Sequence, residues 1–321
     1  MINIVVLDGG AVNPGDISWN SIKLLSDSFK YYPRTEEGEI LERSKGAQIL
    51  LTNKTPLSRK TLKALPDLKY IGVIATGYNV VDVKAAKELG IPVTNVPGYG
   101  SAAVAQYAIG LLLEITLHIG HHSHMVKKGR WQESRDFCFW DIPLSELDGK
   151  TMGIVGLGAI GSKVARISLA LGMKVVAYNG PRAPKGEHPG VELVELAKLF
   201  READVISLHA PLNKDNIGLI NLKSLSLMKD GVLIVNTARG ALINEEALAK
   251  ALKSGKVAAA ALDVLCSEPP TDDNPLLNLD NCLITPHLAW SPREARLRLM
   301  EIAKENIRKF LEGTPVNVVN P

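Results

Sequence analysis

The segment that most restricts the fold is Gly156–Gly161, which reads Gly-Leu-Gly-Ala-Ile-Gly. It directly follows the apolar run Met152–Val155, and a helical pattern over Ser162–Leu171 comes right after it. In this context, the first glycine permits a tight turn, the second lets the backbone approach a pyrophosphate, and the third lets helix and strand pack closely. The helix N-terminus adds free N–H groups and a partial positive charge. The motif therefore predicts a dinucleotide site, and the alternative is a purely structural glycine turn.

Buried strands and helices continue to alternate after this motif. Six apolar runs between residues 151 and 285 are each followed by a polar or glycine-containing break. This rhythm is typical of a doubly wound parallel α/β sheet, the Rossmann arrangement. The predicted strands are Met152–Val155, Lys174–Ala177, Val205–Leu208, Val232–Asn236, Val257–Asp263 and Cys282–Thr285.

The first third of the chain shows the same alternation and ends at the break Asn95–Ser101. An amphipathic helical pattern runs from Pro292 to Leu311 and needs a surface to pack on. A chain of 321 residues is expected to form about two domains. We therefore expect a discontinuous α/β domain over 1–100 and 290–321, and a dinucleotide-binding domain over 101–289. The predicted strands of the first domain are Ile4–Leu7, Ala47–Thr52, Tyr70–Ala75 and Val93–Val96.

Composition excludes several classes of protein. The hydrophobic fraction of 46% and charged fraction of 22% are those of a globular chain. The net charge of +3 and the aromatic fraction of 5% do not indicate a basic or aromatic surface for binding nucleic acid. The three cysteines have no metal-ligand spacing and cannot form a disulfide framework, so we expect a reducing, cytoplasmic location. The start of the chain has no signal-peptide pattern, and the apolar segment Ala102–Ile119 is too short to cross a bilayer, so no membrane contact is expected.

The residue after the second predicted strand of the dinucleotide domain bears on the choice of cofactor. An NAD enzyme usually has an acidic residue there to bind the adenosine ribose, but this chain has Asn179. The missing carboxylate removes repulsion of a 2′-phosphate, and Arg182 follows closely enough to pair with one. The sequence therefore favours NADP slightly over NAD. The alternative is that Asn179 binds the ribose of NAD and Arg182 is a solvated loop residue.

Three polar side chains come shortly after buried strands in this domain: Arg239, Glu268 and His287. The carboxyl ends of parallel strands face the ligand crevice of a doubly wound sheet, so these side chains are predicted to converge. Taken singly, each has an ordinary structural explanation: a strand-end ion pair, a loop carboxylate or a capped turn.

The motifs GYGSAAVAQYAIGLLL, GKTMGIVGLGAIG, VNTARGALINEEAL, ALDVLCSEPP and ITPHLAW occur in the order found in the D-isomer-specific 2-hydroxyacid dehydrogenases. The chain resembles this family over essentially its whole length. The segments LDGGAVNPGDISW and GRWQESRDFCFWDIPLSEL resemble its glycerate dehydrogenase/hydroxypyruvate reductase branch. The resemblance implies a flavodoxin-like substrate domain beside the Rossmann domain, and a homodimer whose interface includes the helix from Ala102 and the segment around Trp131.

The resemblance also implies a reaction: hydride transfer between NAD(P)H and a small 2-keto acid, hydroxypyruvate to D-glycerate or glyoxylate to glycolate. Arg239 would hold the carboxylate and carbonyl oxygens of the substrate, and His287 would exchange a proton with the carbonyl oxygen. Glu268 would fix the histidine tautomer and favour its protonated form. The substrate carboxylate would also bind the backbone N–H groups of Ala75, Thr76 and Gly77.

The cofactor contacts that the motif and the resemblance imply are spread over the carboxyl ends of several strands, and Asp263 among them would contact the nicotinamide amide. They are Gly156, Gly158, Ala159, Ile160, Gly161, Asn179, Arg182, His209, Ala210, Pro211, Thr237, Ala238, Arg239, Asp263, His287 and Ala289.

Two other functions stay open. A phosphoglycerate dehydrogenase-like enzyme would need additional cations in the first domain, where Lys54 is a candidate, and many such enzymes carry a regulatory domain for which we expect no room after Asn320. An NAD(H)-sensing corepressor-type protein would have the same fold and act by binding partners. The histidines from His118 to His124 are at helical spacing, but without a nearby carboxylate or cysteine we expect no metal site.

Overall fold

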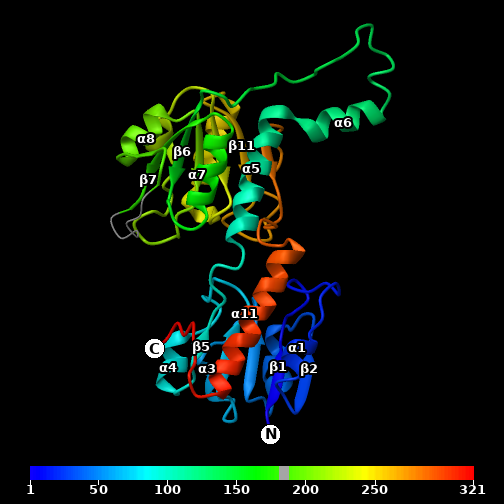
Figure 1. Cartoon of the computed structure of the whole chain (residues 1–321), viewed down its shortest axis with the longest axis vertical. Helices are drawn as coiled ribbons and strands as arrows, with labels where there is room; N and C mark the ends of the chain where they lie inside the picture. The colour runs from blue at the N-terminus through cyan, green and yellow to red at the C-terminus, as the bar shows by residue number, and fades with distance from the viewer. Residues whose placement is uncertain (181–187) are drawn as a thin grey trace. The chain divides into compact units, whose positions relative to one another are not determined.

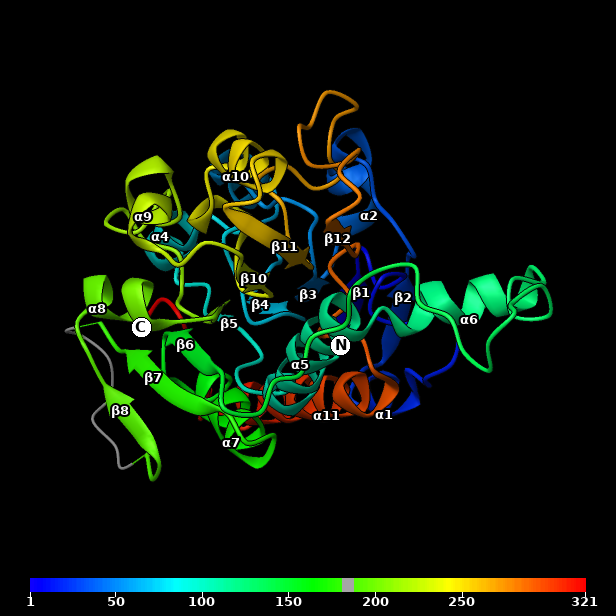
Figure 2. The same ribbon diagram turned by 90° about the horizontal axis from the view of Figure 1, so that it is seen from above.

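The computed structural model describes residues 1–180 and 188–321. These residues divide into two compact units, Met1–Gly100 with Trp290–Pro321, and Ser101–Ala289. Figures 1 and 2 show the ribbon of each unit from two directions. Each unit is built on one parallel β-sheet with helices packed against it.

The sheet of the first unit has the strand order β2-β1-β3-β4-β5, and every neighbouring pair is parallel. This is the 2-1-3-4-5 order of flavodoxin-like sheets, so the predicted flavodoxin-like domain is confirmed. Its central strands β3 and β4 are buried along their whole length. The strands are β1 (Asn3–Val6), β2 (Ser28–Tyr31), β3 (Ile49–Thr52), β4 (Tyr70–Val73) and β5 (Val93–Thr94).

The edge strand β2 is absent from the sequence-based expectation. Its residues alternate between exposed and half-buried, because it lies at the edge of the sheet and pairs only with β1. The strand therefore has no continuous apolar run that would mark it in the sequence.

The long helix α11 (Arg293–Leu311) belongs to the first unit and packs on β4. Its apolar face is buried, and the Phe310 ring lies 4.7 Å from that of Tyr70. At its start, the guanidinium of Arg296 binds the Asp16 carboxylate at 2.6 Å. The remaining helices of this unit are short: α1 (Asn20–Lys23), η1 (Glu37–Glu39), α2 (Ile40–Ser44), α3 (Arg59–Lys63) and α4 (Val83–Glu88).

The described part of the second unit forms a seven-stranded parallel sheet in the order β12-β11-β10-β9-β6-β7-β8. Numbered from β6, the order is 3-2-1-4-5-6 with one further strand, so the predicted Rossmann sheet is confirmed. The expectation of six strands was wrong by one: β8 is an edge strand with exposed Glu192, and no apolar run marks it. The strands are β6 (Thr151–Val155), β7 (Lys174–Tyr178), β8 (Val191–Leu193), β9 (Val205–Leu208), β10 (Val232–Asn236), β11 (Val257–Leu262) and β12 (Cys282–Ile284).

Alternate residues of these strands enter two separate apolar clusters, one on each face of the sheet. For example, Val155 packs with helices α8 to α10, and Ile154 packs with α5 and α7. Because side chains alternate along a strand, each face receives every second residue. The helices are α5 (Ser101–Leu117), α6 (Ile119–Lys127), α7 (Gly161–Ala170), α8 (Leu196–Glu202), α9 (Leu222–Leu227), η2 (Gly240–Leu242) and α10 (Glu245–Lys253).

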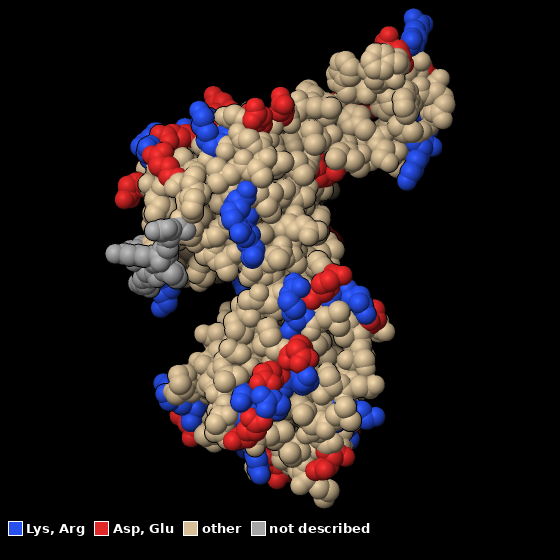
Figure 3. Space-filling view, viewed as in Figure 1, with Lys and Arg blue, Asp and Glu red and all other residues tan. Residues whose placement is uncertain are grey.

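The apolar segment Ala102–Ile119 contributes the helix expected from Ala102, which is α5 and ends at Leu117. His118 has a left-handed backbone (φ 47°), and α5 and α6 meet there at 58°. No single described helix is long and apolar enough to cross a membrane, although this bent pair has the length and composition when taken together. In Figure 3, side chains of both charge signs are interspersed over the visible surface of each unit.

Candidate active site

Most of the predicted site residues lie at one edge of the second unit's sheet. β6, β9, β10, β11 and β12 are mutually parallel, so all of them end at this carboxyl edge. The glycine-rich turn, His209–Pro211, Thr237–Arg239, Asp263 and His287 each follow one of these strands. The structure therefore brings together residues that are up to 131 positions apart in the chain, Gly156 and His287.

His287 and Glu268 form a close pair. Nδ1 of the histidine lies 2.7 Å from Oε2 of the glutamate, and both side chains are about one-third exposed. A carboxylate at Nδ1 stabilises the imidazolium and leaves Nε2 as the nitrogen that can exchange a proton with a ligand. The backbone N–H of Leu265 donates to the other oxygen of Glu268 at 3.2 Å.

Asp263 holds the turn that carries His287. Its carboxylate is 1% exposed and accepts hydrogen bonds from the hydroxyl of Thr285 at 2.7 Å and from the N–H groups of Leu288 and Ala289 at 2.8 Å. The His287 backbone is left-handed (φ 53°), a conformation that costs a non-glycine residue of order 1–3 kcal/mol. The bonds to Asp263 offset this cost. The sequence-based interpretation missed this anchoring role, although an aspartate directly after a buried strand was its signal.

The expected cofactor contacts of Asp263 and Ala289 remain predictions. The Asp263 oxygens already accept three bonds, so a contact with a nicotinamide amide would use a remaining lone pair. Ala289 is 2% exposed, and its N–H is taken by Asp263.

Arg239 is exposed in a turn that Asn236 holds in place. The buried Asn236 amide accepts from the Ala238 N–H at 3.0 Å and donates to the Arg239 carbonyl at 2.9 Å. The next residue, Gly240, packs directly on the loop that carries Glu268: a β-carbon there would lie 1.9 Å from the Leu265 carbonyl carbon. Only glycine permits this approach, which sets the Arg239 turn against the Glu268 loop.

The glycine-rich turn has the close contacts that its pattern predicts. A β-carbon on Gly156 (φ 97°) would lie 2.6 Å from the backbone nitrogen of Ala210, and one on Gly161 would lie 2.1 Å from the Gly156 carbonyl oxygen. By contrast, the β-carbon position of Gly158 has open space around it. Gly158 and Ala159 are exposed, Ile160 follows them, and α7 begins at Gly161.

Two buried polar atoms beside this turn have no hydrogen-bond partner among the described residues: His209 Nδ1 and Thr237 Oγ1. The two residues follow the neighbouring strands β9 and β10, whose last residues pair in register. Nε2 of His209 binds the hydroxyl of Ser207 at 2.8 Å, and burial lowers the pKa of His209 to about 4, so the ring is neutral. An open glycine turn with two unsatisfied polar atoms fits the phosphates and hydroxyls of a dinucleotide.

Asn179 follows β7 and contacts the glycine-rich turn. Its Oδ1 accepts the N–H of Leu157 at 3.2 Å. Arg182, the predicted partner of a 2′-phosphate, lies outside the described residues.

The predicted substrate-carboxylate segment, Ala75–Gly77, lies in the first unit, just after β4. Thr76 is held from both sides: its hydroxyl donates to the Val96 carbonyl at 2.9 Å, and its carbonyl accepts from the Asn95 amide at 2.8 Å. The segment is therefore an ordered turn at the carboxyl edge of its own sheet.

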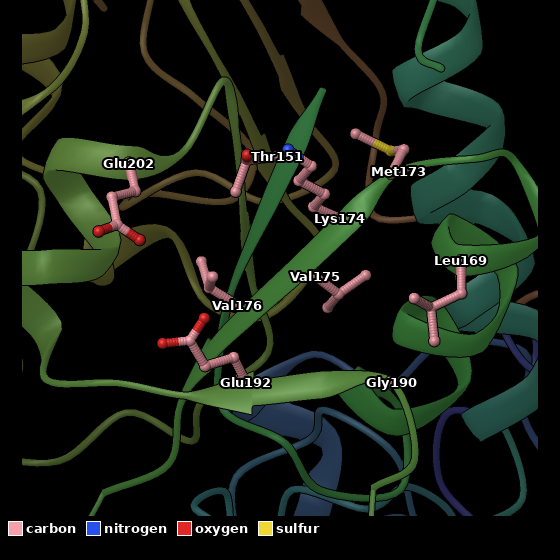
Figure 4. A pocket seen from close by; sticks show the side chains of 9 residues that line it. All are labelled: Thr151, Leu169, Met173, Lys174, Val175, Val176, Gly190, Glu192 and Glu202. Atoms are coloured by element: carbon pink, nitrogen blue, oxygen red, sulfur yellow. The ribbon is translucent and has the colours of Figure 1, made fainter. Parts of the chain in front are cut away.

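Two other features lie apart from this site. The hollow in Figure 4 opens beside Thr151 and Lys174, the first residues of β6 and β7, so it lies at the opposite, amino edge of the sheet. In the α6 region, His121 Nε2 lies 3.4 Å from Asp141. Within the described ranges, no three His, Cys, Asp or Glu side chains are grouped so that they could hold a metal.

Comparison with known proteins agrees with this geometry. The family description "D-isomer specific 2-hydroxyacid dehydrogenase, NAD binding domain" matches residues 109–289. A hydroxypyruvate reductase of Blautia hydrogenotrophica is 51% identical over 99% of this chain and 100% of its own. The chain belongs to the D-isomer-specific 2-hydroxyacid dehydrogenase family. It is an oxidoreductase with an NAD-binding domain.

Further relatives cover nearly the same length. A glycerate dehydrogenase of Methylorubrum extorquens is 41% identical over 88% of each chain. The solved structure of an acyclic imino acid reductase in complex with NADPH and D-Arg has a TM-score of 0.85 at 32% identity, over 99% of this chain and 100% of that one.

Proposed function

We propose that this dehydrogenase catalyses the reversible reduction of hydroxypyruvate to D-glycerate and also accepts glyoxylate. The observation that carries the proposal is the 2.7 Å hydrogen bond between Glu268 and His287 at the sheet edge that also carries Arg239. The names of the relatives from Blautia and Methylorubrum support this choice of substrate.

The bound nicotinamide supplies the hydride. Arg239 binds the substrate through its guanidinium, whose fork of donors suits the carboxylate and carbonyl oxygens of a 2-keto acid. In reduction, Nε2 of His287 gives its proton to the carbonyl oxygen, and in oxidation it takes the proton back. Glu268 stabilises the imidazolium through Nδ1 and so keeps the proton available.

The two units have different roles in this proposal. The second unit, 101–289, is the cofactor domain, because it contains the glycine-rich turn and the unsatisfied atoms of His209 and Thr237. The first unit, 1–100 with 290–321, is the substrate domain, in which the turn Ala75–Gly77 offers backbone N–H groups to the substrate carboxylate.

Both NADH and NADPH are proposed as hydride donors, with a slight preference for NADPH. Asn179 supports this choice, since an uncharged residue beside the glycine-rich turn does not repel a 2′-phosphate. The solved NADPH complex of a relative is consistent with it.

The enzyme is further proposed to be a homodimer. α6 and the segment after it extend away from the sheet of their unit (Figure 1), and this segment exposes the aromatic side chains of Trp131, Phe137 and Trp140. Exposed aromatic groups on a projecting segment are typical of a protein interface.

Assays of hydroxypyruvate, glyoxylate, pyruvate and phosphohydroxypyruvate with NADH and NADPH test the proposal. We expect hydroxypyruvate to give the highest kcat/KM. His287→Ala should lower turnover at least about 10²-fold and leave the NADH dissociation constant unchanged, whereas Lys63→Ala, at an exposed position in the first unit, should change neither.

Other outcomes would overturn the proposal. A clear preference for phosphohydroxypyruvate would favour the phosphoglycerate dehydrogenase alternative. NADH binding with no turnover of any keto acid would favour a corepressor-type protein. Near-normal turnover in His287→Ala would remove this histidine from the mechanism.

A further inference from the structure

Glu268, the hydrogen-bond partner of His287, lies on a segment without regular structure. Glu268 is between the end of β11 at Leu262 and the start of β12 at Cys282, and no helix or strand is formed in between. Loop residues are usually more mobile than the elements they connect. A proton donor must nevertheless be held in its productive geometry, so contacts from elsewhere have to hold this loop.

Glu245, the first residue of α10, makes two such contacts. Its Oε1 accepts the backbone N–H of Cys266 at 2.8 Å, and its Oε2 accepts the side-chain amide of Asn274 at 2.9 Å. Asn274 is 9% exposed, and its own oxygen accepts the Leu276 N–H at 3.0 Å. One carboxylate therefore ties together two points of the loop on either side of Glu268.

The first of these points is adjacent to the active-site pair. The N–H groups of Leu265 and Cys266 are consecutive in the chain: the first donates to Glu268 and the second to Glu245. Gly240 packs closely on the peptide group between Leu265 and Cys266, which carries the second of these N–H groups. A movement of the Cys266 N–H would therefore move the Leu265 N–H that orients the Glu268 carboxylate.

α10 is a firm support for this bond. Its N-terminus is capped by Asn244, whose side chain accepts the Ala247 N–H at 2.9 Å, and its apolar face is buried against the sheet. The next residue, Glu246, is exposed and has no such contact with the loop, so it provides a matched control.

We propose that Glu245 is a positioning residue of this dehydrogenase: it fixes the loop that carries Glu268 and acts on catalysis only through the Glu268–His287 pair. The inference rests on the proposed function. It predicts that loss of the Glu245 contacts misplaces Glu268 and weakens its hold on the imidazolium, while the cofactor site at the glycine-rich turn stays intact.

The test compares Glu245→Gln, Glu268→Gln, the double variant and the control Glu246→Gln in the full-length chain. In Glu245→Gln one of the two carboxylate oxygens becomes an NH2 group, which cannot accept a hydrogen bond from the Cys266 N–H or from the Asn274 amide, so the side chain keeps only one of its two contacts with the loop. We expect kcat for hydroxypyruvate reduction to fall about tenfold, and the alkaline limb of its pH profile to move to lower pH, as in Glu268→Gln. The NADH dissociation constant should not change.

The double variant separates positioning from a general effect on stability. If Glu245 acts through Glu268, the double variant is no slower than Glu268→Gln alone. Multiplied effects, or a fall in kcat with an unshifted pH profile, would overturn the proposal, as would equal effects of Glu246→Gln. Asn274→Ala, which removes the second contact and leaves both carboxylates, should reproduce the shift of the pH profile in weaker form.

The proposal can fail while the proposed function stands. Full activity in Glu245→Gln together with a slow Glu268→Gln would reject only the positioning role. No effect of Glu268→Gln on turnover or pH profile would reject the role of the Glu268–His287 pair, and the positioning role with it. A wild-type protein that does not reduce hydroxypyruvate would instead reject the proposed function.

Discussion

Two carboxylates around His287 serve different purposes. Asp263 is buried and binds the backbone of the turn, so it determines where the ring is. Glu268 is partly exposed and binds Nδ1, so it orients the ring and leaves Nε2 as the nitrogen that can meet a ligand. The difference follows from burial. A buried carboxylate surrounded by hydrogen-bond donors acts as a structural anchor. A carboxylate and an imidazole that are both partly exposed remain accessible to a ligand.

Asn179 provides a test of cofactor choice. In Asn179→Asp the new carboxylate can keep the bond to the Leu157 N–H, and its charge should repel a 2′-phosphate and bind the ribose hydroxyls of NADH. A charge-assisted hydrogen bond contributes roughly 1.5–3 kcal/mol. We therefore expect the ratio of kcat/KM for NADH over NADPH to rise about tenfold or more. Asn179→Ala is the control without charge, and an unmoved ratio in Asn179→Asp would show that this position does not select the cofactor.

His209 predicts a dependence of stability on pH. Burial lowers its pKa from 6.5 to about 4 in the folded protein. Below pH 6.5 the unfolded chain binds a proton at this histidine and the folded chain does not, so stability falls as the pH falls from 6.5 to about 4. The loss from this group is roughly 1.4 kcal/mol for each pH unit.

Denaturant unfolding between these pH values measures the effect. His209→Gln should reduce the slope of unfolding free energy against pH in this window by the stated amount. An identical slope in wild type and His209→Gln would contradict the prediction.

At the scale of elements, the β6–turn–α7 unit shows how one motif combines two requirements. Its first and third glycines are needed for packing within the fold, since β-carbons there would collide with backbone atoms. Its second glycine faces open space and is needed only if a ligand occupies that space.

Alanine substitutions should separate these requirements. Gly161→Ala should lower the melting temperature, because its β-carbon would lie 2.1 Å from the Gly156 carbonyl oxygen and the overlap costs about 1–3 kcal/mol. Gly158→Ala should leave the melting temperature of the free protein unchanged and weaken NADH binding about tenfold or more. Calorimetry and NADH titration of both variants give the comparison. Normal NADH affinity in Gly158→Ala would argue against a pyrophosphate at this turn.

At the scale of the whole molecule, the segment after α6 exposes large aromatic side chains that no part of the same chain covers in the described structure. Phe137 is 89% exposed and Trp140 is 66% exposed. Side chains of this size are rarely left in water on a segment that extends from its domain, so a second copy of the chain is the proposed neighbour.

Sedimentation of charged variants tests the proposed dimer. Phe137→Asp should raise the dissociation constant of the dimer about tenfold or more, because it would bury a charge at the interface. Leu24→Asp, at a position that is 84% exposed in the first unit, should leave it unchanged. A monomeric wild-type protein at assay concentration would refute the homodimer.

Short-range patterns in the sequence were sufficient for much of this protein. The apolar runs that become β3, β4 and β9 are buried on both faces, so their composition alone marks them as central strands. The turn of the glycine motif could be predicted because the steric constraint on Gly161 comes from Gly156, five residues earlier, although Gly156 is itself confined by the distant Ala210. Since parallel strands all end at one edge, Arg239 and His287 could be assigned to the same site before any contact was known.

Contacts between distant segments decided the rest. Edge strands β2 and β8 are half-exposed, and only pairing with β1 and β7 makes them strands. Likewise, the anchoring by Asp263 and the clamp by Glu245 depend on which backbone N–H groups the fold brings within 3 Å of a carboxylate. The residue type of a carboxylate does not show whether it anchors a turn, positions a loop or acts on a histidine. That role is determined by its burial and by the hydrogen-bond donors around it, and both are properties of the folded chain.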